Sequence, residues 1–368
     1  MKTKFFLTPY ETPEKANYQH LAVALAEGLK DLQIQFYGNI DYWFCLDSNE
    51  YLIKSAPENF EADIHVYSTL YFRSNSSFFF QDDKINVLLD ASDGIFTPAQ
   101  DPAFKRFNYI LRTHYNRHFY YPDNVLPWAF GLTKRMINSS SAYTHLEKTI
   151  DILQNFRVDH SLRKYMIDHL NPRLSKYYDI REIITNSAGN VDPHSYWAQT
   201  GRRHDEKYFQ LINSSRYTYV FGGDFQPKPL ISSFYGPPHR LGHRLKRKVL
   251  NMLQIKSKYL VYLNQFDSWR LWEGFCSSTV PIHLDLKEYG CIMPIMPQNG
   301  VHYLGIEDAN QLENFSEKLK ALTNNKLCEI AENGRQWSLE NYGPEATAKR
   351  FLKIVSRSET TGGSSIFT

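Results

Sequence analysis

The chain has 368 residues, with 42 lysine and arginine residues against 39 aspartate and glutamate residues, so its formal net charge is +3. This length predicts two domains, or one unusually large domain. The near-balance of charge argues against a protein that binds nucleic acid by neutralising many phosphates, so we expect no nucleic-acid partner. Hydrophobic residues make up 42% of the chain and only 18 residues are glycine, which excludes a disordered or low-complexity protein.

The N-terminal ten residues are charged and then apolar, but the apolar run breaks at Thr8-Pro9, too early for a signal peptide. No stretch reaches the ~20 apolar residues of a membrane-spanning helix. The cysteines follow neither disulfide-framework nor zinc-site spacing; they are Cys45, Cys276, Cys291 and Cys328. We therefore expect a cytoplasmic protein. Peripheral contact with the inner face of a membrane is permitted, although no basic amphipathic helix stands out that would require it.

The first half of the chain alternates strand and helix patterns. A strand at 4–8, a helix at 15–30 and a strand at 33–37 form a βαβ opening. Three further strands are expected, each followed by a polar or small cluster: 63–67 by Ser68-Thr69, 85–89 by Asp90 to Gly94, and 109–112 by Thr113-His114. Because ligands of open parallel sheets bind at the carboxyl ends of the strands, we expect function at these clusters.

The second half begins with a basic, tyrosine-rich, mostly helical stretch and then repeats the α/β alternation. The expected elements are strands at 149–156, 217–221, 259–263 and 280–284, and helices at 161–170, 244–253 and 269–276. The chain is therefore expected to consist of two α/β halves of similar size, with the boundary between residues 131 and 149.

The stretch 259–285 predicts strand, loop, helix and strand, with Ser268 as the helix N-cap. The free N–H groups at that helix terminus can receive a phosphate, and Arg270 adds a fixed positive charge beside them. Glu273 lies about one turn further on and can accept two hydrogen bonds from a vicinal diol such as a ribose. A nucleoside diphosphate carries both groups.

These residues resemble a known motif. Ser268-x-Arg270-Leu-x-Glu273, followed by Val280-Pro281-Ile282, looks like the donor-binding motif of GT-B glycosyltransferases, most of all the exostosin-like type. Gly274 replaces the usual alanine of that motif, and Ser278-Thr279 stands where Gly-Cys is usual. Gln265 occupies the position of a second acid in retaining enzymes, so the resemblance implies an inverting transferase.

The resemblance extends to the tail, where 332–352 is similar to the closing helices of GT-B enzymes. It implies two Rossmann-like domains that face a central cleft, here 1–145 and 146–345, with a crossing helix and tail at 346–368. It also implies a nucleotide-diphospho-sugar donor, a glycan or lipid-linked acceptor, a role in polysaccharide biosynthesis, and no metal or other cofactor. Basic residues would then hold the diphosphate: Arg157, Arg163, Arg202, Arg203 and His204 beside Arg270.

An inverting transferase needs a base in the N-terminal half to take the proton of the acceptor hydroxyl. Asp90 and Asp93, at the end of the strand at 85–89, are the best-placed carboxylates, with His114 and His20 as alternatives.

Competing interpretations remain open. Arg270 could pair structurally with Asp267 or Glu273, and the whole protein could be a non-catalytic GT-B-like module that binds nucleotide or glycan. A sugar phosphatase or epimerase is less well supported, because neither GxGxxG nor a P-loop is present.

Overall fold

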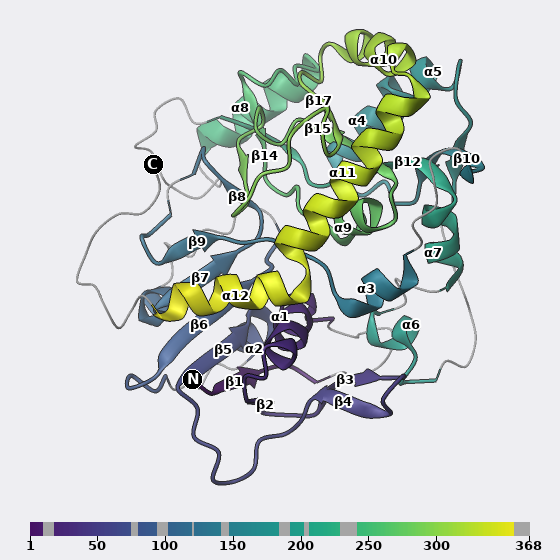
Figure 1. The fold of residues 1–368 in the computed structure, drawn as a ribbon. Coiled ribbons are helices and arrows are strands. Elements are labelled where there is room, and N and C mark those ends of the chain that lie inside the picture. Colours follow the sequence, from purple (N-terminus) through teal and green to yellow (C-terminus); the bar gives the residue numbers. More distant parts are fainter. Residues whose placement is uncertain are drawn as a thin grey trace.

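The structure is a computed structural model, and it describes residues 1–9, 18–74, 80–93, 102–119, 121–140, 147–183, 192–201, 206–228 and 241–356. Its two main sheets lie one in each half of the chain (Figure 1).

The sheet of the first half has six parallel strands in the order β2-β1-β5-β6-β7-β9. The strands are β1 (Thr3–Phe6), β2 (Phe36–Gly38), β5 (Ile64–Ser68), β6 (Ile85–Asp90), β7 (Tyr109–Arg112) and β9 (Val125–Pro127). β5 is buried along its whole length and β6 at every residue but its first, as expected of central parallel strands that are covered on both faces.

The sheet of the second half has five parallel strands in the order β11-β10-β12-β15-β17. These are β10 (Ile150–Gln154), β11 (Ile180–Glu182), β12 (Ser215–Tyr219), β15 (Val280–Leu284) and β17 (Leu304–Ile306). The predicted strand at 280–284 is confirmed. The strand predicted at 259–263 is shorter, β14 (Val261–Leu263), and pairs outside this sheet.

Three antiparallel pairs complete the strands. β3 (Tyr42–Cys45) pairs with β4 (Glu50–Ile53), and β13 (Phe225–Pro227) pairs with β14. β8 (Tyr115–Asn116) pairs with β16 (Cys291–Ile292), so main-chain hydrogen bonds join the two halves of the chain directly.

The helices cover the sheets and connect their strands. They are α1 (His20–Asp31), α2 (Thr69–Ser74), α3 (Lys134–Ser139), α4 (Ser161–His169), α5 (Asn171–Leu174), α6 (Tyr196–Gln199), α7 (Glu206–Asn213), α8 (Leu241–Met252), α9 (Trp269–Cys276), α10 (Leu312–Ala321), α11 (Asn324–Tyr342) and α12 (Pro344–Val355), with a 3₁₀-helix η3 at Pro102–Arg106. The helix predicted at 269–276 is confirmed. α1 begins at His20, later than the predicted helix at 15–30, whose earlier residues reach into a stretch that the structure does not describe.

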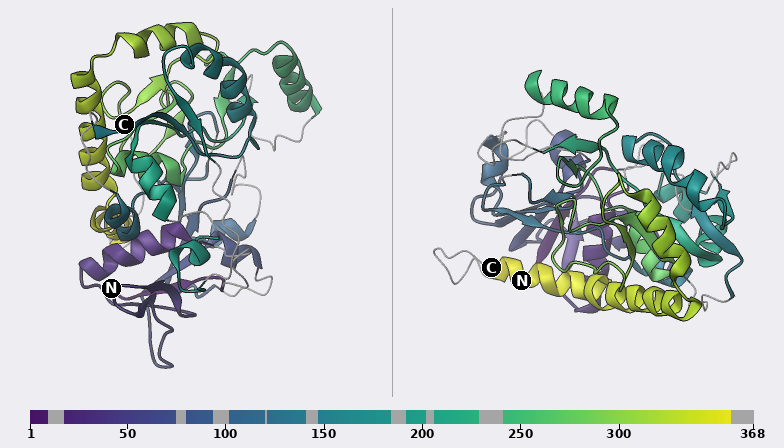
Figure 2. Two further views of the ribbon diagram at one scale, coloured as in Figure 1. Left: turned by 90° about the vertical axis from the view of Figure 1, so that its right-hand side faces the viewer. Right: turned by 90° about the horizontal axis from the view of Figure 1, so that it is seen from above.

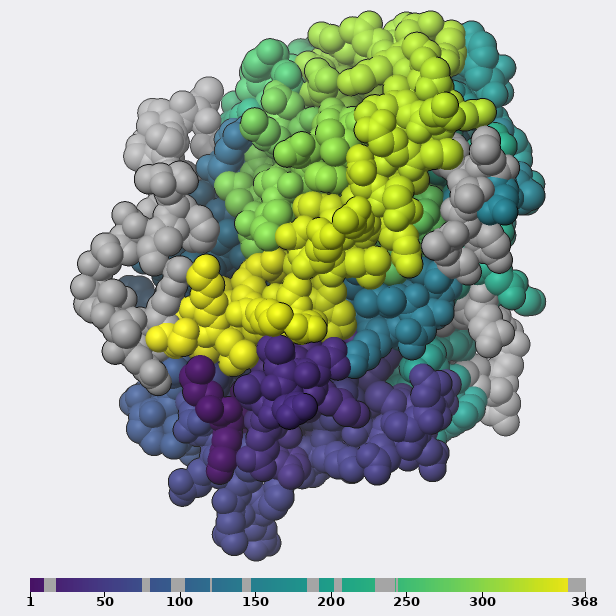
Figure 3. All heavy atoms as spheres, in the orientation of Figure 1, coloured from purple at the N-terminus to yellow at the C-terminus, as the bar shows by residue number. Residues whose placement is uncertain are grey.

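The last two helices tie the halves together. α11 lies along the second half, and the chain turns at Gly343-Pro344 so that α12 returns across the first half (Figures 2 and 3). α12 packs on α1 so closely that a Cβ atom added at Gly28 would lie 1.9 Å from the Pro344 carbonyl oxygen and 2.8 Å from the Ala348 Cβ atom. The predicted return of the C-terminal helix to the N-terminal half is confirmed.

No helix in the described part of the chain is both long enough and apolar enough to cross a membrane.

Candidate functional site

A cavity of about 800 Å³ lies between the two sheets. The first half contributes residues that follow β5 and β6, among them Thr69, Ser92 and Asp93. The second half contributes residues that follow the parallel strand β10, such as Arg157, and residues that follow the antiparallel strand β14, such as Gln265. The carboxyl ends of β5, β6 and β10, from the two parallel sheets, therefore face one space, which is where ligands of such sheets bind.

The loop before α9 forms the floor of this cavity on the side of the second half. Ser268 is the residue before α9, as predicted, with an extended backbone, but among the described residues its side chain makes no capping hydrogen bond. Its hydroxyl is buried in the cavity wall without a hydrogen-bond partner in the described structure. An unsatisfied hydroxyl at a helix N-terminus is a suitable donor for an anionic ligand.

Two guanidinium groups share the same wall. The Arg163 Nε atom donates to the Phe221 carbonyl oxygen at 2.9 Å, and Arg270 donates through Nε to the carbonyl oxygen of Asn155. Burial, and to a smaller extent the nearby positive charge of Arg270, lower the pKa of Arg163 to about 10. Main-chain carbonyls thus fix two cations close together, an arrangement that favours binding of an anion between them. Arg157, more exposed, lines the same cavity.

Arg270 does not take either structural partner considered from the sequence. Its Nε atom bonds to the Asn155 carbonyl, while the Asp267 carboxylate accepts hydrogen bonds from the Phe130 N–H at 2.6 Å and from the Trp272 indole at 2.5 Å. Through its hydrogen bond with the Phe130 N–H, Asp267 ties the loop before α9 to a segment of the first half, a role that the sequence did not indicate. Burial raises the pKa of Asp267 to about 7.

Glu273 lies one turn into α9, as expected, but its side chain is fully buried and does not line the cavity. The Tyr208 hydroxyl donates to its carboxylate, and Tyr208 is the member of the pair that faces the cavity. Burial and the adjacent Glu273 charge raise the pKa of Tyr208 well above its usual value. Tyr208 was missed because it lies 65 positions before Glu273 in the chain, on α7.

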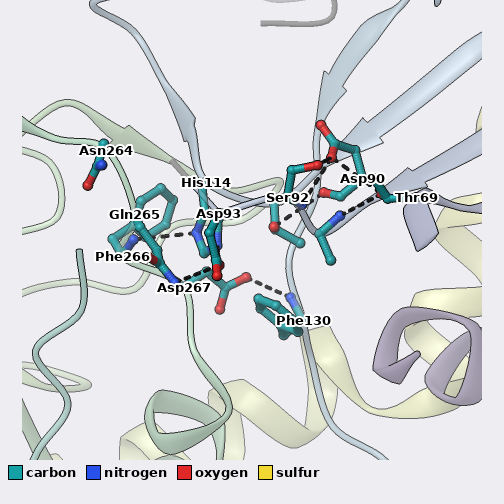
Figure 4. A network of polar contacts seen from close by, with 12 residues as sticks. Thr69, Asp90, Ser92, Asp93, His114, Phe130, Asn264, Gln265, Phe266 and Asp267 are labelled. Atoms are coloured by element: carbon teal, nitrogen blue, oxygen red, sulfur yellow. Dashed lines mark hydrogen bonds and ion pairs between the residues drawn. The ribbon is translucent and has the colours of Figure 1, made fainter. Parts of the chain in front are cut away.

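The two carboxylates predicted as the base have different surroundings. Asp90 is 1% exposed and forms a buried ion pair with Arg112. It also accepts hydrogen bonds from the Ser92 hydroxyl and main-chain N–H and from the Thr69 hydroxyl (Figure 4). Asp90 itself does not line the cavity. Its contacts are those of a group that shapes the loop after β6.

The Asp93 side chain is 77% exposed and lies at the cavity. It accepts a 2.7 Å hydrogen bond from the Gln265 amide and lies 3.8 Å from the His114 Nε2 atom (Figure 4). His114 is buried, and burial lowers its pKa. Of the two candidate carboxylates, Asp93 is thus the one that is exposed and lines the cavity.

His20 lines the cavity, but its ring nitrogens are engaged. Its Nε2 atom is 3.1 Å from the carbonyl oxygens of Phe130 and Gly131, and its Nδ1 atom is 3.0 Å from the Tyr18 hydroxyl. The carbonyls can only accept, so the proton belongs on Nε2 and the Tyr18 hydroxyl donates to Nδ1. Arg202, Arg203 and His204 lie outside the described residues, directly after Gly201, which lines the cavity.

No protein-family model matches the chain, and no curated protein matches its sequence. Solved structures do match its fold over nearly its whole length. An α-glucosyltransferase in complex with UDP-glucose and DNA containing an abasic site matches with a TM-score of 0.54 at 9% identity, over 97% of this chain and 99% of that one. AviGT4, a glycosyltransferase involved in avilamycin A biosynthesis, matches with a TM-score of 0.50 at 10% identity, over 97% of both chains.

The chain has the GT-B fold of these glycosyltransferases. The predicted fold class is confirmed, whereas the exostosin-like subtype stays a prediction. At identities of 10% or less, this similarity shows the fold alone. It does not assign a role to any residue that lines the cavity between the two halves.

The exclusion of nucleic acid is wrong. α-Glucosyltransferases with the GT-B fold are solved together with DNA, one with UDP-glucose and another with UDP and a 13-mer that contains an HMU base. A net charge near zero does not exclude a phosphate backbone as partner, because it is the local arrangement of cations that decides such binding.

Proposed function

We propose that the protein is a glycosyltransferase that moves a sugar from a nucleotide-diphospho-sugar to an acceptor hydroxyl in the cavity between its halves. The proposal rests on how charge is divided between the two sides of the cavity. Three arginines of the second half, Arg157, Arg163 and Arg270, line it near the N-terminus of α9, and the carboxylate of Asp93 lines it from the first half. A glycosyl donor needs cations at its leaving diphosphate, and an acceptor needs a base.

On the donor side, Arg270, Arg163 and the Ser268 hydroxyl would bind the diphosphate, with Arg157 at the cavity's edge. Arg202, Arg203 and His204 remain further candidates. UDP is the first nucleotide to test, since UDP or UDP-glucose is bound in α-glucosyltransferases that share this fold. Glu273 would reach the ribose only together with Tyr208, which lies between its carboxylate and the cavity.

On the acceptor side, Asp93 would take the proton. The acceptor oxygen attacks the anomeric carbon, the bond from that carbon to the diphosphate oxygen breaks, and the hydroxyl proton moves to the Asp93 carboxylate. The bonding electrons leave with the diphosphate, and the arginine side chains balance its negative charge, so the proposed reaction is metal-independent. A single displacement by the acceptor oxygen inverts the configuration of the anomeric carbon, so the proposed reaction is also inverting. Asp90 would act indirectly, by holding the loop that carries Asp93.

The acceptor is proposed to be a glycan or a lipid-linked hydroxyl, in keeping with exostosin-like transferases of polysaccharide biosynthesis, and the proposed compartment is the cytoplasm.

A non-catalytic GT-B-like protein that binds nucleotide or glycan, or that serves as a scaffold, is the second candidate. The burial of Glu273 against Tyr208 favours it over a transferase, because the carboxylate expected at the ribose of the donor does not line the cavity.

A thermal-shift series with UDP, GDP, dTDP and CMP tests the donor site. We expect stabilisation by at least one nucleotide, its loss in Arg270→Ala, and its retention in Arg216→Ala, whose guanidinium pairs with Asp151 outside the cavity. If none of the nucleotides stabilises the protein, the donor assignment fails. If a nucleotide binds but its sugar conjugate is neither transferred nor hydrolysed, the non-catalytic candidate is correct.

A further inference from the structure

Helix α8 exposes an apolar face to solvent. Leu245, Val249 and Met252 follow one another at helical spacings of four and three residues, so they lie on one side of the helix. Their exposed fractions are 63%, 41% and 73%. Leu250, in contrast, is 8% exposed and attaches the helix to the body of the protein. Among the side chains of α8 that the structure describes, Leu250 therefore makes the apolar contact with the core, while Leu245, Val249 and Met252 form a second, exposed apolar face.

The apolar face continues beyond the helix. Leu253 is 56% exposed, and Tyr259 and Leu260, just before β14, are 74% and 41% exposed. We call these six residues the α8 ridge: Leu245, Val249, Met252, Leu253, Tyr259 and Leu260. They are half of the large hydrophobic side chains that are exposed among the described residues, yet they fall within 16 consecutive positions. A concentration of this kind marks an interaction surface.

The helix that bears the ridge is basic, so α8 is a basic amphipathic helix of the kind that did not stand out from the sequence. Arg244, Arg247 and Lys248 are exposed on α8, and the sequence from 241 to 252 contains no acidic residue. None of these three side chains forms an ion pair with a carboxylate in the described part of the chain. Lys246 is half-buried and donates to the carbonyl oxygen of Lys228, the residue after β13, which ties the helix to the end of that strand. The uncompensated charges adjoin the apolar ridge.

The position of α8 leaves this surface accessible. The helix stands out from the body of the molecule, on the side opposite α12 in both views of Figure 2. The apolar face is also linked to the cavity along the chain, because β14 connects Leu260 with the segment that contains Gln265, a residue that lines the cavity. A surface bound at α8 would therefore lie on the half of the protein that carries the proposed donor wall.

From this arrangement we infer that α8 and the α8 ridge dock on an anionic lipid bilayer. The ridge would enter the boundary between headgroups and acyl chains, and Arg244, Arg247 and Lys248 would contact the anionic headgroups. Nucleic acid would satisfy the cations but leave the ridge in water. A second copy of the chain would cover the ridge but bring two basic helices together. Of these three partners, only the bilayer satisfies both features, and this inference does not depend on the proposed glycosyl transfer.

Co-sedimentation of the full chain with vesicles tests the inference. We expect binding to vesicles made of equal parts of phosphatidylcholine and phosphatidylglycerol, and weak binding to phosphatidylcholine alone. Leu245→Glu with Met252→Glu should weaken binding roughly tenfold or more, because it removes buried apolar area and adds negative charge. Arg244→Glu with Lys248→Glu should weaken it by a similar factor, since each cation near an anionic surface strengthens binding.

Matched controls keep the result specific. Leu46→Glu changes a residue of similar exposure, 45%, in the first half, and Lys353→Glu changes an exposed lysine of α12. Both controls should bind vesicles as the wild type does, and all variants should keep the wild-type unfolding temperature.

Three results would overturn the inference. The first is the absence of vesicle binding, or binding that neither α8 variant weakens. The second is a concentration-dependent dimer that Leu245→Glu with Met252→Glu abolishes, which would assign the ridge to a second copy. The third is binding of duplex DNA that the charge variant abolishes and the ridge variant leaves intact.

Discussion

The Asp93 carboxylate accepts a 2.7 Å hydrogen bond from the side-chain amide of Gln265, so that a residue following β6 meets a residue following β14 across the cavity. Gln265 stands where the resemblance to retaining enzymes places an acid. The amide of Gln265 can donate a hydrogen bond to the Asp93 carboxylate, whereas a carboxylate at position 265 would repel Asp93. The pair therefore joins the two halves at the point where the proposed base lies.

We expect Asp93→Asn to lower the turnover of sugar transfer by about 10²- to 10⁴-fold, the usual effect of losing a general base. The measurement is kcat with saturating UDP-sugar. Asp82→Asn is the control, because Asp82 is an exposed carboxylate paired with Arg106. Gln265→Ala separates the two possible roles of Asp93. If the contact between the halves were its only role, Gln265→Ala would reduce kcat as much as Asp93→Asn does.

Removal of the Tyr208 hydroxyl should affect the donor more than the acceptor. In Tyr208→Phe the buried Glu273 carboxylate loses one hydrogen-bond donor, which should lower the free energy of unfolding by roughly 1 to 3 kcal/mol. Because Tyr208 lies at the cavity wall beside Glu273, KM for the nucleotide-sugar should rise while KM for the acceptor changes little. Tyr178→Phe, at a hydroxyl bonded to the Leu319 carbonyl oxygen, is the control. Equal changes in both KM values would contradict a donor-side position.

The buried Glu27 should make stability depend on pH. Burial raises the pKa of this carboxyl from 4.5 to about 8, while its Oε2 atom accepts a 2.6 Å hydrogen bond from the Lys134 N–H. Between these two values the folded chain holds a proton that the unfolded chain has released. The contribution of Glu27 is thus present in full below about pH 4.5 and is lost as the pH rises through about 8.

Glu27→Gln keeps a hydrogen-bond acceptor for Lys134 and removes the titration. Urea unfolding at a series of pH values should therefore show that the variant gains stability relative to the wild type from about pH 4.5 to 8, by a few kcal/mol at most, since one pKa unit corresponds to about 1.4 kcal/mol. Glu58→Gln, at the surface, should leave the wild-type profile unchanged. A Glu27→Gln profile parallel to that of the wild type would show that Glu27 does not titrate in this range.

The contact between α1 and α12 should not tolerate a side chain at Gly28. The added methyl group of Gly28→Ala would meet the Pro344 carbonyl oxygen, so α12 must shift, at a cost of roughly 3 kcal/mol or more. Gly242→Ala is the matched control, because no atom of the described residues lies within 4 Å of a Cβ atom there. We expect the unfolding temperature to fall in the first variant and to stay constant or rise in the second. Equal temperatures would show that the helices are not in close contact.

The sequence by itself predicted the elements with strong local patterns. The helix at 269–276 and the strand at 280–284 follow from an N-cap position, a hydrophobic periodicity and a Val-Pro-Ile run, all of which are properties of neighbouring residues. The same local reasoning placed Asp90 and Asp93 after a strand and Arg163 and Arg270 near strand ends. Local sequence patterns therefore identified residues of both cavity walls, but they gave no distances between those residues.

Only the tertiary structure separated residues that look alike in the sequence. Asp90 and Asp93 are three positions apart, but Arg112 from β7 buries the first and Gln265 from the other half meets the second. Glu273 is buried against the Tyr208 hydroxyl and does not line the cavity, and among the described side chains of α8 Leu250 is buried while Leu245 and Met252 stay exposed. Each outcome depends on partners far away in the chain, because burial and charge pairing are set by packing between elements and not by the periodicity within one.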